Sequence, residues 1–347
     1  MKKIFLPIFI ILLAYGLLVG FLYLLIILSD NNFSFQNTLN FLTDFSGVNR
    51  GEPSITLFAV GDIMLDRGVD EMVKEKGSGD FRFPFFLVAD YLKKADILFG
   101  NLESVISDKE GEKAEKTGSV QVYLKAKPEA IEGLVYAGFD IVSVANNHAL
   151  DYGRQVFEDS LKRLEKADIE YIGGGFNNKE TFSVKIKEIK GTKIGFLAYT
   201  YPKFDGTYIP WKPTEEESGV AVIEKKELEK IEQEIAKAKK EVDILIVSSH
   251  RGEEYSLQPS EEQILFDKAF IDSGADLVIG HHPHVLQPLE KYKNGWIAYS
   301  LGNFIFDMTS EETKRGAILE VTIKNKKIER VVLKETKNSD FFQPYLK

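Results

Sequence analysis

The chain contains no cysteine. This absence excludes disulfide bonds, thiolate zinc ligands and a cysteine nucleophile, so any bound metal must rely on histidine, asparagine and carboxylate ligands. Basic residues are also in deficit, because 44 Lys and Arg face 53 Asp and Glu and the net charge is -9. Nucleic-acid binding needs clustered Lys and Arg to neutralise phosphates, and the chain has no Arg-rich stripe. We therefore expect no nucleic-acid partner.

Histidine is scarce too, and all five copies lie in short polar clusters that directly follow apolar runs. Each of these runs begins with an aspartate, and the clusters contain His148, His250, and the trio His281, His282 and His284. Two further apolar runs lead into Asp62 and Glu103. Continuous Val, Ile and Leu runs are typical of strands covered on both faces, and open α/β sheets carry their chemistry beyond the carboxyl ends of such strands. The sequence predicts that five strand ends converge on one polar site.

A single histidine at a strand end is more often structural than functional. Five of five in this position, with Asp62 and Glu103 at two further strand ends, indicate a metal centre. Carboxylate, amide and imidazole donors suit divalent Mn, Fe, Zn or Mg. The Asn146-Asn147-His148 cluster has an alternative interpretation, as a turn with a helix cap ahead of Asp151.

The N-terminus predicts a membrane anchor. Lys2 and Lys3 form a short cytoplasmic tail (1–3), and an uncharged apolar span follows over residues 4–28, long enough to cross a hydrocarbon core of about 30 Å. The next basic residue is Arg50, so the positive-inside bias places the rest of the chain outside the membrane. A cleaved signal peptide is the alternative. Beyond the span we expect a tether (29–53), a globular domain (54–335) and a C-terminal tail (336–347).

Past the tether, strand-like runs alternate with helix-like stretches, which predicts an α/β fold. Two segments, 182–199 and 316–333, have the turn residues and alternation of hairpins. A pair of mixed sheets with helices outside follows. Helical spacing of apolar residues covers 83–94, 128–137, 154–166, 225–241 and 261–273. The long loop over 201–219 is either a cover for the site or a solvated connector.

Six polar motifs follow one another along the globular part of the chain. They are Gly61-Asp62-Ile-Met-Leu, Gly100-Asn101-Leu-Glu103, Asn146-Asn147-His148-Ala-Leu-Asp151-Tyr-Gly153, His250-Arg-Gly-Glu-Glu-Tyr255, Gly280-His281-His282-Pro-His284-Val-Leu-Gln287 and Ser300-Leu-Gly-Asn303-Phe-Ile-Phe-Asp307. In this order they resemble the motifs of the CapA family of poly-γ-glutamate capsule synthesis proteins, and the match spans residues 55–308, nearly the whole globular part. The family is in turn similar to the calcineurin-like metallophosphoesterases, and this resemblance implies a four-layer α/β/β/α sandwich with two metals over the strand ends.

The resemblance implies a role for each matching residue. Glu103 stands at the position of a bridging carboxylate, and His148 at that of the acid that protonates a leaving group. Asp151 would orient His148, as a carboxylate fixes an imidazole tautomer. The remaining implied metal ligands are Asp62, Asn147, His250 and two of the final trio. Within the trio, His284 is the first choice. The choice between His281 and His282 stays open in the sequence, although the spacing of one residue to His284 favours His282, because alternate residues of an extended segment face one way.

One departure concerns the first motif, which in the superfamily is Asp-x-His. Here Met64, a soft thioether, stands at the third position, so the first metal site is expected to be weak or empty. Arg67 and Asp66 lie close by and could engage an anionic substrate or replace a ligand, although an exposed ion pair is an equal alternative. Asn303 and His281 are further candidate site residues.

Two functional classes remain. The first is a metal-dependent hydrolase or transferase outside the membrane, acting on a phosphoester or amide. The second is a non-catalytic subunit that binds the anionic polymer and organises a membrane synthase. Under both, the family resemblance implies capsule production, with the membrane, poly-γ-glutamate or a related polymer, and capsule synthase subunits as partners. The retention of every polar motif favours the catalytic class.

Overall fold

The computed structural model describes residues 53–116, 121–204, 207–208 and 211–347. Ser54–Lys347 form one compact unit. No helix in the described ranges has both the length and the apolar character needed to span a bilayer. The predicted tail 1–3, the predicted span 4–28 and all of the tether except Pro53 lie outside the described residues.

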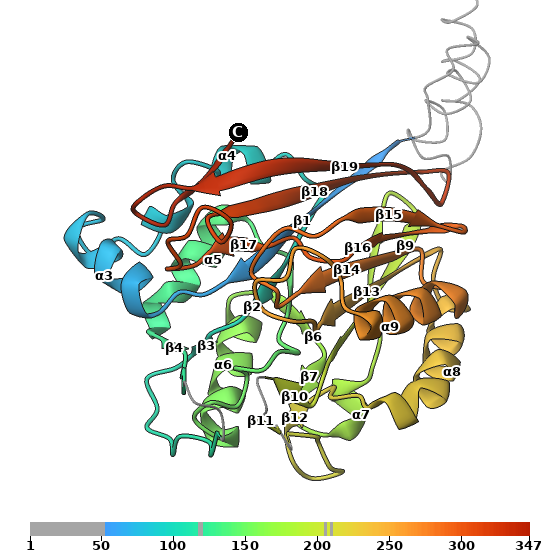
Figure 1. Ribbon diagram of the computed structural model, residues 1–347, viewed down its shortest axis with the longest axis horizontal. Coiled ribbons are helices and arrows are strands. Elements are labelled where there is room, and N and C mark those ends of the chain that lie inside the picture. The colour runs from blue at the N-terminus through green and yellow to red at the C-terminus, as the bar shows by residue number, and fades with distance from the viewer. Residues whose placement is uncertain (1–52, 117–120, 205–206, 209–210) are drawn as a thin grey trace, which may run out of the picture. The chain divides into compact units, whose positions relative to one another are not determined.

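Two mixed β-sheets form the centre of the unit (Figure 1). The larger has the order β20-β19-β18-β1-β2-β5-β6, with β17 also paired to β1. Strands β1, β2, β5 and β6 are parallel, whereas β18, β19 and β20 run antiparallel to their neighbours. The bounds are β1 (Ile55–Ile63), β2 (Ile97–Leu102), β5 (Ile141–Ser143), β6 (Glu170–Ile172), β17 (Asn303–Ile305), β18 (Arg315–Lys324), β19 (Lys327–Asn338) and β20 (Pro344–Leu346).

The second sheet has the order β15-β16-β14-β13-β9-β8. Its four inner strands are parallel and its two outer strands antiparallel. The bounds are β8 (Lys185–Ile189), β9 (Thr192–Thr200), β13 (Ile244–His250), β14 (Leu277–His281), β15 (Leu289–Tyr292) and β16 (Gly295–Ala298). Three small strand pairs complete the β-structure: β3 (Val105–Ile106) with β4 (Lys125–Ala126), β7 (Gly174–Gly175) with β12 (Gly219–Val220), and β10 (Lys203–Phe204) with β11 (Thr207–Tyr208).

Helices cover the sheets, with α8 and α9 beside the second sheet and α5 and α6 near the first (Figure 1). Within the described residues the α-helices are α3 (Arg67–Glu75), α4 (Ala89–Leu92), α5 (Ile131–Ala137), α6 (Arg154–Lys166), α7 (Asn178–Thr181), α8 (Leu228–Lys239) and α9 (Glu261–Asp272). The 3-10 helices are η1 (Phe83–Phe85), η2 (Pro128–Ala130) and η3 (Lys225–Glu227).

Three apolar clusters account for this layering. One cluster lies between the sheets and combines side chains of β1 and β2 with those of β9, β13 and β14, such as Phe99 and Phe196. A second joins the other face of the first sheet to residues of α4, α5 and α6, and a third joins the other face of the second sheet to α8 and α9. The central strands are therefore buried on both faces. This is the reason that their sequences are continuous runs of Val, Ile and Leu.

The aspartates that begin four strands have a shared structural role. In each case one carboxylate oxygen accepts a hydrogen bond from a backbone N–H near the start of the neighbouring parallel strand. The bonds are Thr56 N to Asp96, 2.8 Å, Leu98 N to Asp140, 2.7 Å, Lys193 N to Asp243, 2.9 Å, and Leu245 N to Asp276, 2.7 Å. Each aspartate satisfies a terminal donor of the ladder and aligns two strands.

Both predicted hairpins are confirmed. Lys190 and Gly191 join β8 to β9, with φ of 50° and 75°, and Asn325 and Lys326 join β18 to β19, with φ of 52° and 59°. Positive φ at both central residues matches the right-handed twist of the flanking strands.

Other segments differ from the expectation. The single helix predicted over 83–94 is instead η1 and α4, because Phe86 and Leu87 between them are exposed and interrupt the buried stripe. Helix α3 was not predicted. Residues 336–347, expected as a tail, contain the end of β19 and the whole of β20, which pair with each other.

The inter-sheet cluster should dominate stability. Phe196 is fully buried and its ring stacks on Phe99 with centroids 6.2 Å apart. We predict that Phe196→Ala lowers the free energy of unfolding by about 3–5 kcal/mol, because it removes buried area and leaves a cavity. Denaturant titration of the purified protein measures this. The matched change Phe341→Ala, at a side chain that is 45% exposed, should cost less than about 1 kcal/mol, and equal losses at the two positions would contradict the assignment of the core.

Candidate metal centre

The carboxyl ends of strands from both sheets meet, as the sequence predicts. Asp62 pairs in register with Asn101 in the larger sheet, and His250 with His281 in the smaller. Between the sheets, Asn101 Nδ2 lies 3.3 Å from His250 Nδ1, and His281 Nδ1 lies 3.2 Å from Asp62 Oδ1. These four side chains are fully buried.

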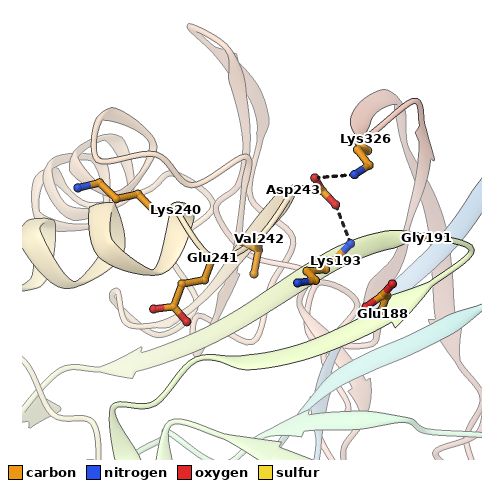
Figure 2. A pocket seen from close by; sticks show the side chains of 8 residues that line it. All are labelled: Glu188, Gly191, Lys193, Lys240, Glu241, Val242, Asp243 and Lys326. Carbon is orange, nitrogen blue, oxygen red and sulfur yellow. Dashed lines mark hydrogen bonds and ion pairs between the residues drawn. The ribbon is translucent and has the colours of Figure 1, made fainter.

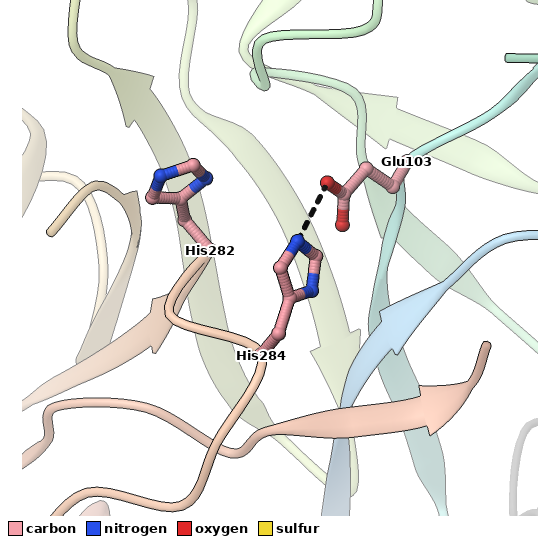
Figure 3. A group of neighbouring side chains, drawn as sticks. All are labelled: Glu103, His282 and His284. Carbon is pink, nitrogen blue, oxygen red and sulfur yellow. Dashed lines mark ion pairs between the residues drawn. The ribbon is translucent and has the colours of Figure 1, made fainter. Parts of the chain in front are cut away.

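Two groups of side chains within this cluster have the spacing of metal ligands. Asp62, Glu103 and His250 form one, and Glu103, His282 and His284 form the other; within each group the potential ligand atoms lie within 4.8 Å of one another. Figure 3 shows the second group, in which the His284 ring and the Glu103 carboxylate approach each other from opposite sides. Glu103 belongs to both groups, so its carboxylate lies where two ions could share it.

Glu103 provides the test of whether a metal fits. Its carboxylate is fully buried, and neither oxygen has a hydrogen-bond partner among the described residues. Burial, and then the neighbouring charge of Asp62, raises the pKa of Glu103 well above its ordinary value. A buried carboxylate without a partner is costly, and a bound cation offsets that cost. Oxygen and imidazole donors in this arrangement fit Mn, Fe, Zn or Mg.

Asp62 is held in its ionised form. Burial by itself raises the pKa of the Asp62 carboxyl, but contact with His281 and the charges of the neighbouring histidines bring it below its usual range. Asn101 Nδ2 donates to Oδ1 at 2.9 Å, and the backbone N–H of His282 donates to Oδ2 at 3.1 Å. An ionised carboxylate at this position is suited to binding a cation.

Asn147 and His250 approach each other closely. Asn147 Oδ1 lies 2.8 Å from His250 Nε2. Burial lowers the pKa of His250 and of His282 well below the ordinary value, so both rings are neutral near pH 7. The neutral imidazole is the form that binds metal.

Asn303 orients His284. Asn303 Oδ1 lies 2.9 Å from His284 Nδ1, and because an amide oxygen only accepts, Nδ1 carries the hydrogen. The lone pair is then on Nε2, which lies 3.8 Å from Glu103 Oε1. An outer hydrogen bond of this kind fixes ring orientation in metal sites. The structure thus places Asn303 in contact with the candidate ligand His284.

The structure groups His282, and not His281, with Glu103 and His284. The argument from an extended segment was nevertheless wrong. His282 and His284 have φ of 98° and 58°, in the left-handed region, whereas His281 is the last residue of β14. A turn of left-handed residues brings the two rings to the same side.

Met64 belongs to the apolar core. Its side chain is fully buried in the apolar cluster of the first sheet, and its sulfur accepts a hydrogen bond from Asp66 N at 3.1 Å. Asp66 Oδ2 accepts from Lys125 N at 2.8 Å, and Arg67 pairs with Asp307. The alternative of an exposed ion pair between Arg67 and Asp66 is therefore wrong, because each of the two side chains has a separate partner.

His148 lies beside the ligand groups with a carboxylate behind it. Its Nδ1 is 2.7 Å from Asp151 Oδ2, and burial lowers the pKa of the ring while the charge of Asp151 raises it in part. Lys116, which sequence reasoning missed, places Nζ 2.5 Å from Asp151 Oδ1 and 3.4 Å from His148 Nδ1. Its local sequence, Glu112-Lys113-Ala114-Glu115-Lys116, is that of a solvated segment, so no local signal marks it.

The Asn146 side chain does not cap a helix. It donates to Asn101 Oδ1 at 3.3 Å and to the Leu102 carbonyl at 2.8 Å, and its own oxygen accepts from His148 N at 3.1 Å. The N-cap of α6 is Gly153. Asn146 therefore links the ends of β2 and β5 and supports the loop that carries Asn147 and His148.

A separate recess lies at the opposite end of β13 (Figure 2). It encloses about 360 Å³, and Asp243 at its centre pairs with Lys326 at 3.2 Å. Its lining mixes both charge signs: Glu188, Gly191, Lys193, Lys240, Glu241, Val242, Asp243 and Lys326. Lys193 and Asp243 lie at the amino ends of β9 and β13, the opposite ends of these strands from Thr200 and His250.

The chain belongs to the bacterial capsule synthesis protein PGA_cap family, whose match covers residues 56–308. It is 36% identical over 283 residues to the capsule biosynthesis protein CapA of Bacillus anthracis, covering 80% of this chain and 66% of that protein. It is 32% identical over 266 residues to the PGA biosynthesis protein CapA of Bacillus subtilis (strain 168), covering 76% and 67%. The chain thus spans about two thirds of the length of these relatives.

Among solved structures, a phosphatase of Mycoplasma pneumoniae aligns over 82% of this chain and 94% of its own, with a TM-score of 0.47 and 16% sequence identity. The family resemblance seen in the six motifs is confirmed by the closer relatives.

The ligand groups predict the effect of removing single histidines. His250→Ala or His284→Ala should release at least one ion per chain, measured by elemental analysis, and should lower the melting temperature. Bound metal stabilises the native state by about 2.7 kcal/mol at a hundredfold excess over Kd, and this contribution is lost with the ion. His148→Ala is the control, and it should retain its metal. If all three variants keep both metal and stability, the ligand assignment is wrong.

Proposed function

We propose that this member of the capsule synthesis family acts in the synthesis or export of poly-γ-glutamate or a related capsule polymer, as a metal-dependent hydrolase or transferase. The two CapA relatives are named for capsule and PGA biosynthesis, which supports the polymer assignment. The observation that carries the catalytic part is the position of His148, held by Asp151, beside the buried ligand groups.

In this proposal Asp62, Glu103, Asn147, His250, His282 and His284 hold the ions. A divalent ion bound there would supply Lewis acidity and a bound water with a pKa near about 7, for attack on a phosphoryl or amide group. The apolar layers on both sides exclude bulk water from these side chains, since all six are buried. The proposed fold type is the four-layer sandwich of the metallophosphoesterases, supported by the order of helices, sheet, sheet and helices.

His148 moves a proton in the proposed reaction. To act as the acid, His148 must enter the reaction as the imidazolium, with hydrogen on both ring nitrogens; the nearby charge of Asp151 favours that form. Asp151 accepts the hydrogen bond from Nδ1, and the proton on Nε2 passes to the leaving group, which leaves a neutral ring. Leu124 N also donates to Asp151 Oδ2 at 2.8 Å, and Lys116 pairs with Oδ1, which holds the carboxylate in place. The imidazole therefore has a single orientation towards the site.

A scaffold role is the second candidate, and Met64 favours it. A hydrophobic residue buried in the core at the third position of the first motif removes one imidazole from the first ion. In that case the ligand groups would bind the anionic polymer through metal, and the chain would organise synthase subunits without turnover.

The two candidates predict different results for His148→Ala. If His148 donates a proton, its loss should reduce turnover by on the order of 10² to 10⁴, while binding of polymer fragments stays near wild type. A screen of phosphoester and amide substrates with the metal-loaded protein would supply the assay. Complementation of a capsule-deficient strain gives an independent reading, with Glu103→Gln as the variant expected to fail under either role. Full complementation by His148→Ala at normal protein levels would leave only the scaffold.

The proposal places the globular unit outside the cell membrane, held by the apolar span 4–28, with capsule synthase subunits as partners. Lys2 and Lys3 before the span support this orientation. Protease added to intact cells, or to spheroplasts where an outer membrane exists, should digest the globular unit. A protected full-length protein, in a preparation where a known surface protein is digested, would show that the orientation is wrong.

A further inference from the structure

One edge of the Arg67 guanidinium pairs with the carboxylate of Asp307, which lies 240 residues away along the chain. Arg67 Nε donates to Asp307 Oδ2 at 3.0 Å, and Nη2 pairs with Oδ1. The backbone N–H of Gly68 donates to the same Oδ2 at 3.1 Å. A guanidinium has five N–H donors, and this side-on contact uses two of them. The outer edge of the guanidinium, which carries Nη1, has no hydrogen-bond partner among the described residues.

The guanidinium lies beside the ligand groups. Its Cζ is 5.8 Å from the centroid of the Phe306 ring, and that ring meets His284 edge-on with centroids 4.7 Å apart. The charge of Arg67 reaches Glu103, whose pKa it lowers in part against the effects of burial and Asp62. The Arg67 side chain is 34% exposed, so its outer edge is open to an incoming molecule.

The backbone around this contact is strained. Arg67 has a φ of 51°, and Tyr255, His282 and His284 at the same site also have positive φ. Left-handed conformations of such residues are strained and gather at binding sites. Gly68 brings its backbone so close to Asp307 that an added Cβ would lie 3.0 Å from the Asp307 Cβ. The segment is thus held in the conformation that presents Arg67.

We propose that Arg67, positioned by Asp307, binds an oxyanion of the substrate, a carboxylate or a phosphate, at the rim of the metal centre. This inference rests on the proposed function and names the chemistry of its ligand. A planar fork of N–H donors matches carboxylate and phosphate geometry, and prior orientation by Asp307 reduces the entropy lost on binding. Asp307 acts through Arg67 and is a positioning residue.

The test uses the full-length protein in detergent, loaded with Mn²⁺, and measures the Kd of inorganic phosphate and of a short γ-linked glutamate oligomer by calorimetry. Arg67→Gln should weaken binding of at least one probe by about tenfold or more, because it removes charge-assisted hydrogen bonds. Metal content should stay at the wild-type value. Loss for phosphate alone identifies a phosphoryl group as the ligand, and loss for the oligomer alone identifies a carboxylate.

Arg82 provides a matched control. It is held side-on by Asp80, with Nε to Oδ1 at 2.9 Å and Nη2 to Oδ2 at 2.6 Å, and its Cζ is 5.6 Å from the Tyr136 ring. Arg82→Gln removes the same kind of pair from a surface that contacts none of the ligand groups within the described ranges. It should leave both Kd values unchanged.

Asp307→Asn separates positioning from a merely structural role. Alone it should weaken anion binding by less than Arg67→Gln, and in the Arg67→Gln background it should have no further effect on Kd. A structural role would instead lower the melting temperature in both backgrounds and leave the Kd of the folded protein unchanged.

The proposal is overturned if the metal-loaded wild type binds neither probe, or if Arg67→Gln binds both within about twofold of wild type. If Arg67→Gln loses metal, the Kd values of both probes are measured instead for Arg67→Lys at full metal content. The same thresholds for the change in Kd then apply. Metal content and the His148→Ala assays are read separately, so a failure of the proposed function is distinguishable from a failure of the Arg67 assignment.

Discussion

Strand register is the constraint on which the rest of this structure depends. A shift of one residue turns every side chain of a strand to the opposite face. His250 would then point into the layer of α8 and α9, and the ligand groups would not form. The strand-initial aspartates oppose such a shift, because Asp96, Asp140, Asp243 and Asp276 each bond to a backbone N–H of the adjacent strand. The alignment of the strands at their amino ends thus determines which side chains meet at their carboxyl ends.

What meets there is an unfavourable set of groups for a protein interior. Glu103 has no hydrogen-bond partner within the described part of the chain, and Asp62 is buried beside it. The two carboxylates repel, and burial removes the water that would screen them. The fold tolerates this arrangement because histidines and amides surround Asp62 and because a cation can be shared through Glu103. Local stability is lower at such a cluster, as is common at functional sites.

Two further side chains near the candidate ligands are each held by a carboxylate. Asp151 contacts the His148 ring and also pairs with Lys116. Asp307 pairs with the Arg67 guanidinium, which also lies near the Phe306 ring. In both cases a carboxylate orients a nitrogen-containing side chain. If the proposed roles hold, the first would supply a proton and the second would bind an anionic group of the substrate.

The sequence by itself determined the strand runs, the two hairpins and the set of polar residues at the strand ends, because burial on both faces, positive φ in short turns and strand polarity leave local patterns. It also carried the six motifs on which the resemblance to the family rests. Only the tertiary structure decided the rest. His282, and not His281, is grouped with Glu103 and His284 because of left-handed φ values, which the residue types do not predict. Lys116 pairs with Asp151, and Arg67 pairs with Asp307, across segments that are far apart in sequence. Sheet packing brings these segments together, so the neighbouring residues in the sequence do not indicate either pair.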